Sequence, residues 1–248
     1  MKEFKKSRNG PFAHLRWASE VEAYREADLF WTGHVPGWSH PRMLKAGQDC
    51  SLTVNRIPGP LCSWDSAVML LNELVRASQY GAGCSQSLVL PIQLPTVTDT
   101  KHLSKAASVA NEWSTSHSLP QFRINGDVHP GNVICHSPMC LVLIDWELSR
   151  HGFIVEDLGS FIAHSLIAAE RGNVPDTLPT VLLKNASSAI PAAVIAAFTI
   201  IDLYWQSARE RRLNNHLGAN FRERIAAKLS SLLRIEGAVL TAPDRWRR

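Results

Sequence analysis

The segment from Ile124 to Glu147 constrains the fold most strongly; it reads INGDVHPGNVICHSPMCLVLIDWE. It contains two short apolar runs, NVICH and CLVLIDW, which are separated by Ser-Pro-Met. Short apolar runs on either side of a proline-containing turn are typical of a β-hairpin. A Pro-Gly turn comes just before the first run, and Asp127 precedes that turn. The segment is therefore predicted to form a turn and then a hairpin, with polar side chains at its open end.

Two of these polar side chains are candidate metal ligands. Asn132 begins the first apolar run, and Asp145 comes near the end of the second. If the two strands pair around Ser-Pro-Met, the two side chains lie side by side. Oxygen ligands of this kind suit Mg²⁺, which takes one or two protein oxygens and completes its octahedron with water and phosphate oxygens.

Asp127 is a candidate catalytic acid–base group. It faces the same point from the other side of the Pro-Gly turn, within reach of an incoming hydroxyl. A carboxylate placed beside a metal-bound phosphate is the expected acceptor of the hydroxyl proton in phosphoryl transfer. Taken singly, an Asp before a Pro-Gly turn is a common turn former, and Asp145 alone could be a helix cap or a surface acid. The joint spacing of the three residues favours the chemical interpretation.

The residues GDVHPGNVI, LVLIDWE and DLGSF resemble the catalytic segment of the aminoglycoside phosphotransferase and choline kinase families. That segment usually reads HGDLHPGNIL…IDWE…DLA, within a protein-kinase-like fold. The resemblance implies that Asp127 is the catalytic Asp and that Asn132 and Asp145 bind Mg²⁺. It also implies that Asp157 is a structural acid supporting the loop. His129, in the same turn, is interpreted as a residue that braces the loop rather than a proton shuttle.

A weaker resemblance extends towards the N-terminus. SEVEAYREA is similar to the N-lobe helix of these families, which would make Glu20 the acid that pairs with the ATP-phosphate lysine. LTVNRIPGPL is similar to the strand and hinge that hold adenine. The resemblance therefore implies ATP-binding roles for Thr53, Asn55 and Ile57.

The phosphate lysine itself has three candidates. MKEFKKS would be the lysine strand, with Lys2 as the residue that contacts phosphate. Lys5 and Lys6 are the competing choices, and a solvated basic N-terminus is the structural alternative. VPGWSHPRML, downstream of the helix, is predicted to be a loop because Pro and Gly interrupt regular structure.

The chain departs from the family pattern in two places. Asn125 stands where the family has His before Gly-Asp. No G-x-G-x-x-G or P-loop pattern occurs, so the glycine-rich lid over the nucleotide is expected to be absent and the N-terminal lobe truncated. A gene fragment, a degenerate kinase and an enzyme with an open nucleotide site are all compatible with this. The alternative function is therefore a catalytically impaired, pseudokinase-like binding module.

The expected architecture is α+β and protein-kinase-like, with two lobes. Residues 1–62 are predicted to form a reduced N-terminal lobe with a two- or three-stranded sheet. Residues 63–248 are predicted to form a helical C-terminal lobe that carries the catalytic hairpin 124–147. Helices are expected at 13–31, 64–80, 101–116, 157–171, 176–188, 190–213 and 217–235. The apolar stretch Ala192 to Leu203 is too short to span a bilayer and is predicted to be a buried helix.

Composition narrows the remaining functions. The net charge is only +4 and the basic clusters are short, which argues against nucleic-acid binding. The five cysteines are odd in number and lack CxxC spacing, which favours reduced thiols in a cytoplasmic protein. The charged N-terminus has no apolar h-region, so no signal peptide is expected. Neither a G-x-S-x-G nor an H-E-x-x-H motif is present.

The sequence thus predicts a small-molecule kinase that uses ATP and Mg²⁺ to phosphorylate a hydroxyl acceptor. From Glu170 to Arg248 there are twelve Lys and Arg against seven Asp and Glu. A polycationic aminoglycoside would be attracted to an acidic pocket rather than to a basic lobe. A small alcohol, sugar or amino-alcohol is therefore the expected acceptor, although a few acids such as Asp202 or Glu210 could still bind a cation.

Overall fold

The computed structural model describes residues 3–7, 13–34, 38–80, 92, 94–96, 101–117, 121–137 and 140–233. The chain divides into two compact units. One combines Met1–Ala67 with Phe122–His151, and the other combines Val68–Gln121 with Gly152–Arg248. The first stretch ends close to the division expected near residue 62. The hairpin 124–147, however, groups with the N-terminal residues rather than with the helices.

Strands and short 3₁₀ turns make up much of the first unit, and helices make up the second. The strands are β1 (Glu3–Ser7), β2 (Trp38–Ser39), β3 (Met43–Ala46), β4 (Ser51–Asn55), β5 (Phe122–Ile124), β6 (Val133–Ser137), β7 (Cys140–Leu143) and β8 (Arg150–Gly152). The α-helices are α1 (Ala13–His34), α2 (Ala67–Tyr80), α3 (Lys101–Ser116), α4 (Ile154–Glu170), α5 (Leu178–Ala186), α6 (Ala192–Arg212) and α7 (His216–Leu229). The 3₁₀ turns are η1 (Trp64–Ser66), η3 (Pro130–Asn132) and η4 (Ser230–Leu233).

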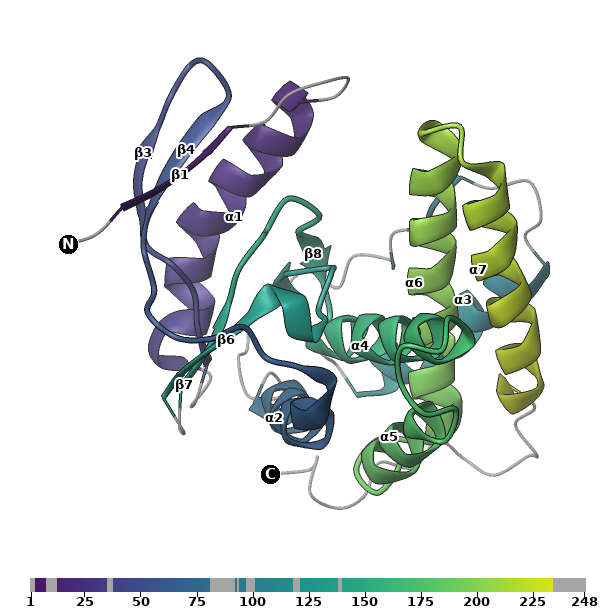
Figure 1. Ribbon diagram of the computed structural model, residues 1–248. Helices are drawn as coiled ribbons and strands as arrows, with labels where there is room; N and C mark the ends of the chain where they lie inside the picture. Colours follow the sequence, from purple (N-terminus) through teal and green to yellow (C-terminus); the bar gives the residue numbers. More distant parts are fainter. Residues whose placement is uncertain are drawn as a thin grey trace. The chain divides into compact units, whose positions relative to one another are not determined.

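The first unit contains an antiparallel sheet in the order β1-β4-β3, as the prediction of a small N-terminal sheet requires. Figure 1 shows α1 lying along this sheet, and α1 packs against β3 and β4. Leu52 and Val54 of the central strand are buried. Trp17 of α1 donates its indole N–H to the carbonyl of Ser51 at 3.0 Å, which joins the helix to the strand.

The predicted hairpin is confirmed. β6 and β7 pair antiparallel, with Val133 opposite Leu143 and Ser137 opposite Cys140. β2 adds to the other edge of β7 in parallel, which gives the order β2-β7-β6. Val133 and Leu143 are buried, as the apolar character of both runs indicates.

Two expectations about strands are wrong. The segment VPGWSHPRML, expected to be a loop, contains β2 and the start of β3. Pro41 lies between the two strands rather than inside either, so the lost N–H interrupts neither ladder. The run CLVLIDW was expected to be a strand throughout, but β7 ends at Leu143. Asp145 therefore lies beyond the strand.

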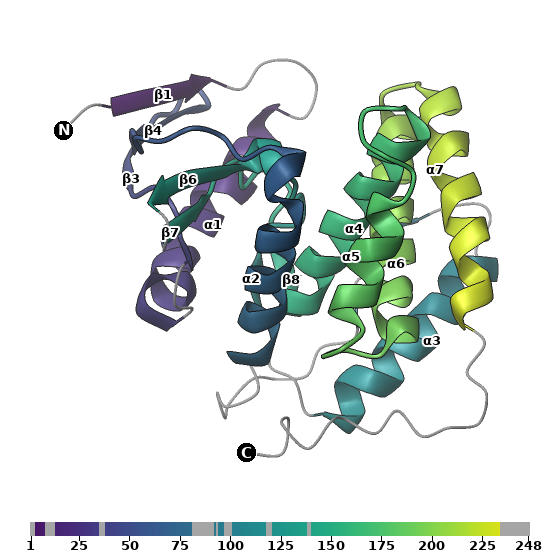
Figure 2. The same ribbon diagram turned by 60° about the horizontal axis from the view of Figure 1, so that its bottom comes forward.

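Helix α6 forms the centre of the second unit. It packs against α3, α4 and α7, and it is buried along most of its length. Figure 2 shows α6 beside α7 and near α4. Contacts on several sides explain why Ala192 to Leu203 is apolar almost without interruption. The prediction of a buried helix over this stretch is confirmed.

Gly159 sets the close approach of α4 to α6. A Cβ at this position would lie 2.7 Å from the backbone carbon of Phe198 and 2.9 Å from the nitrogen of Thr199. Any larger side chain would force the two helices apart. The close packing of α4 on α6 therefore requires the Gly in DLGSF.

The mixed α+β class predicted from the sequence is confirmed. Each expected helix is present, although α4 begins at Ile154 instead of residue 157. Glu156 explains the earlier start, because its carboxylate accepts a hydrogen bond from the N–H of Phe153 at 2.9 Å. None of the described helices is both long enough and apolar enough to cross a lipid bilayer.

Candidate active site

Lys6, Glu20 and Asp145 meet in the first unit. The Nζ atom of Lys6, on β1, lies 2.6 Å from Oε1 of Glu20 on α1. The same atom lies 2.8 Å from Oδ1 of Asp145, just after β7. The Glu20 side chain is only 1% exposed. A carboxylate buried this deeply requires a compensating charge, and Lys6 supplies it.

Glu20 therefore pairs with a lysine of the N-terminal strand, and that lysine is Lys6. Lys2, the first choice from the sequence, lies outside the described residues. Lys5 points away from Glu20, because alternate residues of a strand face opposite sides of the sheet. Its side chain is 61% exposed and lies 3.8 Å from a carboxylate oxygen of Asp49.

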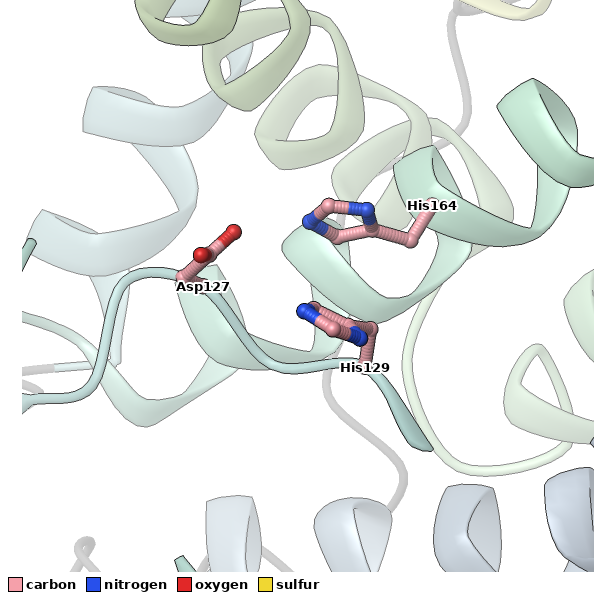
Figure 3. A group of neighbouring side chains, drawn as sticks. All are labelled: Asp127, His129 and His164. Carbon is pink, nitrogen blue, oxygen red and sulfur yellow. The ribbon is translucent and has the colours of Figure 1, made fainter. Parts of the chain in front are cut away.

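Asp127 and Asn132 lie at the two ends of the Pro-Gly turn. The Nδ2 atom of Asn132 donates to the carbonyl of Asp127 at 3.0 Å, which closes the turn. The Nδ1 atom of His129 accepts from the N–H of Gly131 at 3.1 Å, which agrees with the expected bracing role. Figure 3 shows the side chains of Asp127 and His129 projecting from this loop; His164, also drawn, belongs to α4 of the second unit.

The turn is fastened to the residues that follow β7. The N–H of Ile144 donates to the carbonyl of Asn132 at 3.0 Å. Asn132 and Asp145 thus lie at the open end of the hairpin, as the sequence predicts. The local backbone at Asp145 is unusual, because its φ of 59° lies in the left-handed region. That conformation ends β7 and turns the chain immediately after Ile144.

Asn125 links the two halves of the site. It is fully buried, and its Oδ1 accepts from the N–H of Asp127 at 3.2 Å. Its Nδ2 lies 3.3 Å from the carbonyl of Ile144 and 3.5 Å from that of Asp145. Asn125, which stands where the resembled families have His, therefore connects the turn at Asp127 to the segment that follows β7. Sequence reasoning identified the departure but not this bridging role.

Trp146 packs beneath this region. It is fully buried, and its indole N–H donates to the carbonyl of Leu143 at 3.0 Å. Its ring centroid lies 6.4 Å from that of Tyr24 and 6.2 Å from that of His40. These contacts hold the segment after β7 against α1 and the β2 region of the same unit.

Of the predicted ATP-binding residues, Thr53 lies in the middle of β4, Asn55 ends the strand, and Ile57 follows it. Thr53 pairs with Lys5 of β1 and with Lys45 of β3. Asn55 has a structural task, since its side-chain oxygen accepts from the N–H of Arg42. Ile57 is half-buried beyond the strand.

Asp157, expected to be a structural acid, is fully buried in the first turn of α4 in the second unit.

Comparisons with known proteins identify a matching family model and similar folds. The sequence model described as the phosphotransferase enzyme family matches residues 94–182. No curated protein matches the chain. The solved structure of choline kinase LicA from Streptococcus pneumoniae has a TM-score of 0.58 at 13% identity, over 92% of this chain and 85% of that one.

Aminoglycoside phosphotransferase APH(4)-Ia has a TM-score of 0.56 at 13% identity, over 90% of this chain and 84% of that chain. A thermostable mutant of that enzyme, in a ternary complex with AMP-PNP and hygromycin B, has a TM-score of 0.52 at 11% identity. That match covers 87% of this chain and 83% of the other. The fold is thus the protein-kinase-like fold of these phosphotransferases, and the resemblance recognised in the catalytic segment is confirmed.

Proposed function

We propose that this protein is a small-molecule kinase that transfers the γ-phosphoryl group of ATP to a substrate hydroxyl with the help of Mg²⁺. The observation that carries the proposal is the contact of Lys6 with both Glu20 and Asp145. It unites a cation suited to phosphate, the buried acid that fixes this cation, and a carboxylate suited to a metal. A simple structural ion pair would need only one of the two acids.

The donor set at the hairpin end fits Mg²⁺. The Nδ2 of Asn132 is held by the carbonyl of Asp127, so the amide presents its Oδ1 on the opposite side. Asp145 contributes a carboxylate from a half-buried position. One amide oxygen and one carboxylate match the small number of protein ligands that Mg²⁺ takes when phosphates complete its shell. Bound there, the ion would neutralise charge on the β- and γ-phosphates.

Asp127 is the proposed proton acceptor. As the hydroxyl oxygen forms its bond to the γ-phosphorus, the bond from that phosphorus to the bridging oxygen breaks and ADP leaves with the electron pair. The hydroxyl proton passes to a carboxylate oxygen of Asp127. Asn125 and Asn132 hold the backbone on both sides of this residue, so the carboxylate is positioned before substrate arrives.

Lys6 is the proposed phosphate-binding residue, with Glu20 holding it in place. Thr53, Asn55 and Ile57 are the proposed neighbours of adenine, by resemblance to the family's strand and hinge. Binding of AMP-PNP by one relative supports a nucleotide role for this fold. An ammonium group between two carboxylates has little freedom to move, which lowers the entropic cost of contacting a phosphate.

The proposed acceptor is a small alcohol, sugar or amino-alcohol of low positive charge. Several acids of the helical unit are already neutralised by basic partners. Glu210 lies 2.9 Å from Arg222, and Glu223 lies 2.9 Å from Arg211. Acids paired with arginine in this way contribute little long-range attraction for a polycation. Asp202 differs, because it is buried and its carboxylate accepts from the uncharged amide of Gln206 at 2.7 Å.

Two measurements test the function. Thermal unfolding with Mg²⁺ and ATP, compared with EDTA and ATP, should show a stabilising shift that requires the metal. Transfer of labelled γ-phosphate should then be screened against aminoglycosides, choline, homoserine, macrolides and ketosamines. Turnover of a weakly charged acceptor is expected. Robust turnover of kanamycin-like substrates would contradict the acceptor class, and a lack of any metal-dependent shift would favour the non-catalytic binding module instead.

A further inference from the structure

A second ionic cluster lies on α1, away from Lys6. Arg123, on β5, is only 7% exposed. Its Nη2 donates to Oε2 of Glu22 at 2.8 Å. Its Nε lies 3.5 Å from Oε2 of Glu26, and Nε2 of His151 lies 3.3 Å from that same oxygen. Strand β5 and strand β8 thus present a buried guanidinium and an imidazole to two acids on one face of α1.

This face is nearly opposite the one that carries Glu20. At 3.6 residues per turn, Glu22 lies about 200° and Glu26 about 240° around the helix from Glu20. The helix is therefore held by charge on both sides, by Lys6 on one and by Arg123 on the other. Ser19 of α1 makes a further contact with the residue that precedes β8, since its hydroxyl donates to the carbonyl of Ser149 at 3.2 Å.

Arg123 is also joined covalently to the catalytic turn. It precedes Asn125 by two residues and Asp127 by four. Strand β5 therefore leads directly to Asp127, the proposed proton acceptor. The same strand also holds α1, the helix that carries Glu20. A displacement of α1 relative to β5 would move Glu20 with respect to Lys6 and Asp145.

We propose that Arg123 is a positioning residue for the phosphate-binding lysine, acting through α1. Its ion pairs with Glu22 and Glu26 fix the helix so that Glu20 reaches Lys6. The nucleotide part of this inference rests on the proposed kinase function, whereas the positioning of Lys6 does not. Arg suits the task because its planar guanidinium can address two carboxylates at once.

The informative substitution is Arg123→Met, which removes the charge and keeps a long apolar side chain. Of the two acids left behind, Glu22 is 62% exposed and can be hydrated. Glu26 is 31% exposed and keeps His151 at 3.3 Å. In nucleotide-free protein, Lys6 should be acylated faster by acetic anhydride than in wild type, as measured by mass spectrometry. The Kd for Mg²⁺–ATP should rise by about tenfold, at a temperature well below unfolding. With Arg123→Lys, both the acylation rate of Lys6 and the Kd should lie closer to the wild-type values.

Two comparisons separate positioning from general destabilisation. Arg211→Met breaks an ion pair with Glu223 in the helical unit, and it should lower Tm without changing Lys6 acylation. In a Glu20→Gln background, adding Arg123→Met should have little further effect on either readout, since the acid it positions is gone.

Unchanged Lys6 acylation in Arg123→Met, or full additivity with Glu20→Gln, would overturn the proposal. A wild-type protein that binds no nucleotide would instead overturn the kinase function. The acylation measurements would still decide whether Arg123 positions the lysine.

Discussion

The Nζ atom of Lys6 lies 2.8 Å from Oδ1 of Asp145, although 139 positions separate the two residues in the chain. Lys6 comes from the edge strand β1, and Asp145 follows the hairpin strand β7. The contact joins the proposed phosphate-binding group to the proposed metal ligand. It also makes the two groups mutually dependent, because loss of either alters the charge around the other.

Replacing Lys6 by Met should weaken binding of Mg²⁺–ATP by about 10- to 100-fold, which corresponds to one charge-assisted hydrogen bond. Stability should fall as well, because Glu20 would remain buried without its cation. Isothermal titration calorimetry and thermal unfolding would measure the two effects.

Lys5→Met is the matched control, since Lys5 is exposed and its ion pair with Asp49 is long, at 3.8 Å. It should change neither quantity appreciably. The double variant Lys6→Met/Glu20→Gln should recover stability but not nucleotide affinity. Equal losses in Lys5→Met and Lys6→Met would assign the effect to general basic charge rather than to the geometry at Glu20.

Replacing Asp145 by Asn should abolish Mg²⁺-dependent turnover while the fold stays intact. Asn tolerates the left-handed region better than most residues, so the φ of 59° at this position can be kept. Activity titrated with Mg²⁺ and the far-UV circular dichroism spectrum would test the two halves of this statement. Turnover at the wild-type level would remove Asp145 from the metal site.

Replacing Gly126 by Ala should disturb the backbone at Asp127, the proposed proton acceptor, through two separate effects. Its φ is +78°, and a Cβ would lie 2.6 Å from both Nη1 of Arg150 and the carbonyl oxygen of Leu148. Gly172→Ala isolates the first effect, because its φ is +71° and no atom lies within 4 Å of the added carbon. The backbone cost should be about 1–2 kcal/mol in both.

Only Gly126→Ala should lose more stability than this backbone cost, and only Gly126→Ala should also lose activity. Chemical denaturation would give both unfolding free energies. If the two variants are equally stable and equally active, the close contacts around Gly126 do not affect function.

Burial raises the pKa of the Cys62 thiol to about 12, and a hydrogen bond with Cys135 adds to the effect. The folded state therefore holds the proton more tightly than the unfolded state, whose value is 9.0. The stability contributed by this neutral thiol is complete below pH 9 and is lost as the pH rises towards 12.

Cys62→Ala should accordingly show a shallower loss of stability than wild type between pH 9 and pH 12, the two pKa values that bound the titration. Denaturation with urea across this range would measure the difference. Alkylation of native Cys62 at pH 8 should also be slow, since the thiolate is the reactive form. Parallel stability curves for the two proteins would contradict the assignment.

Much of the fold follows from local pattern. The helices have apolar spacing that persists over many residues, and the hairpin is signalled by two apolar runs around Ser-Pro-Met. The contact of Asn132 with Asp127 spans only five positions, so the turn itself largely specifies it. These features depend on near neighbours, and near neighbours are visible in a sequence.

The lysine that pairs with Glu20, which is the proposed phosphate-binding residue, was decided only by tertiary structure. Phe4 and Lys6 share one face of β1, whereas Lys5 lies on the other, because side chains alternate along a strand with a period of two. The register that sets Lys6 opposite Leu52 of β4 brings Lys6 to Glu20. Register depends on contacts between distant segments, so the sequence pattern alone did not indicate that Lys6 would meet Glu20.

The bridging role of Asn125, the left-handed turn at Asp145 and the ion pairs of Arg123 were likewise absent from the sequence pattern. Each depends on which backbone carbonyl or carboxylate another segment delivers. The sequence by itself determined the α+β class and the order of the helices, and it is the source of the proposed chemistry of the Asp-Asn-Asp set. Tertiary packing decided which charges meet, because the energy of an ion pair depends on separation and burial rather than on position in the chain.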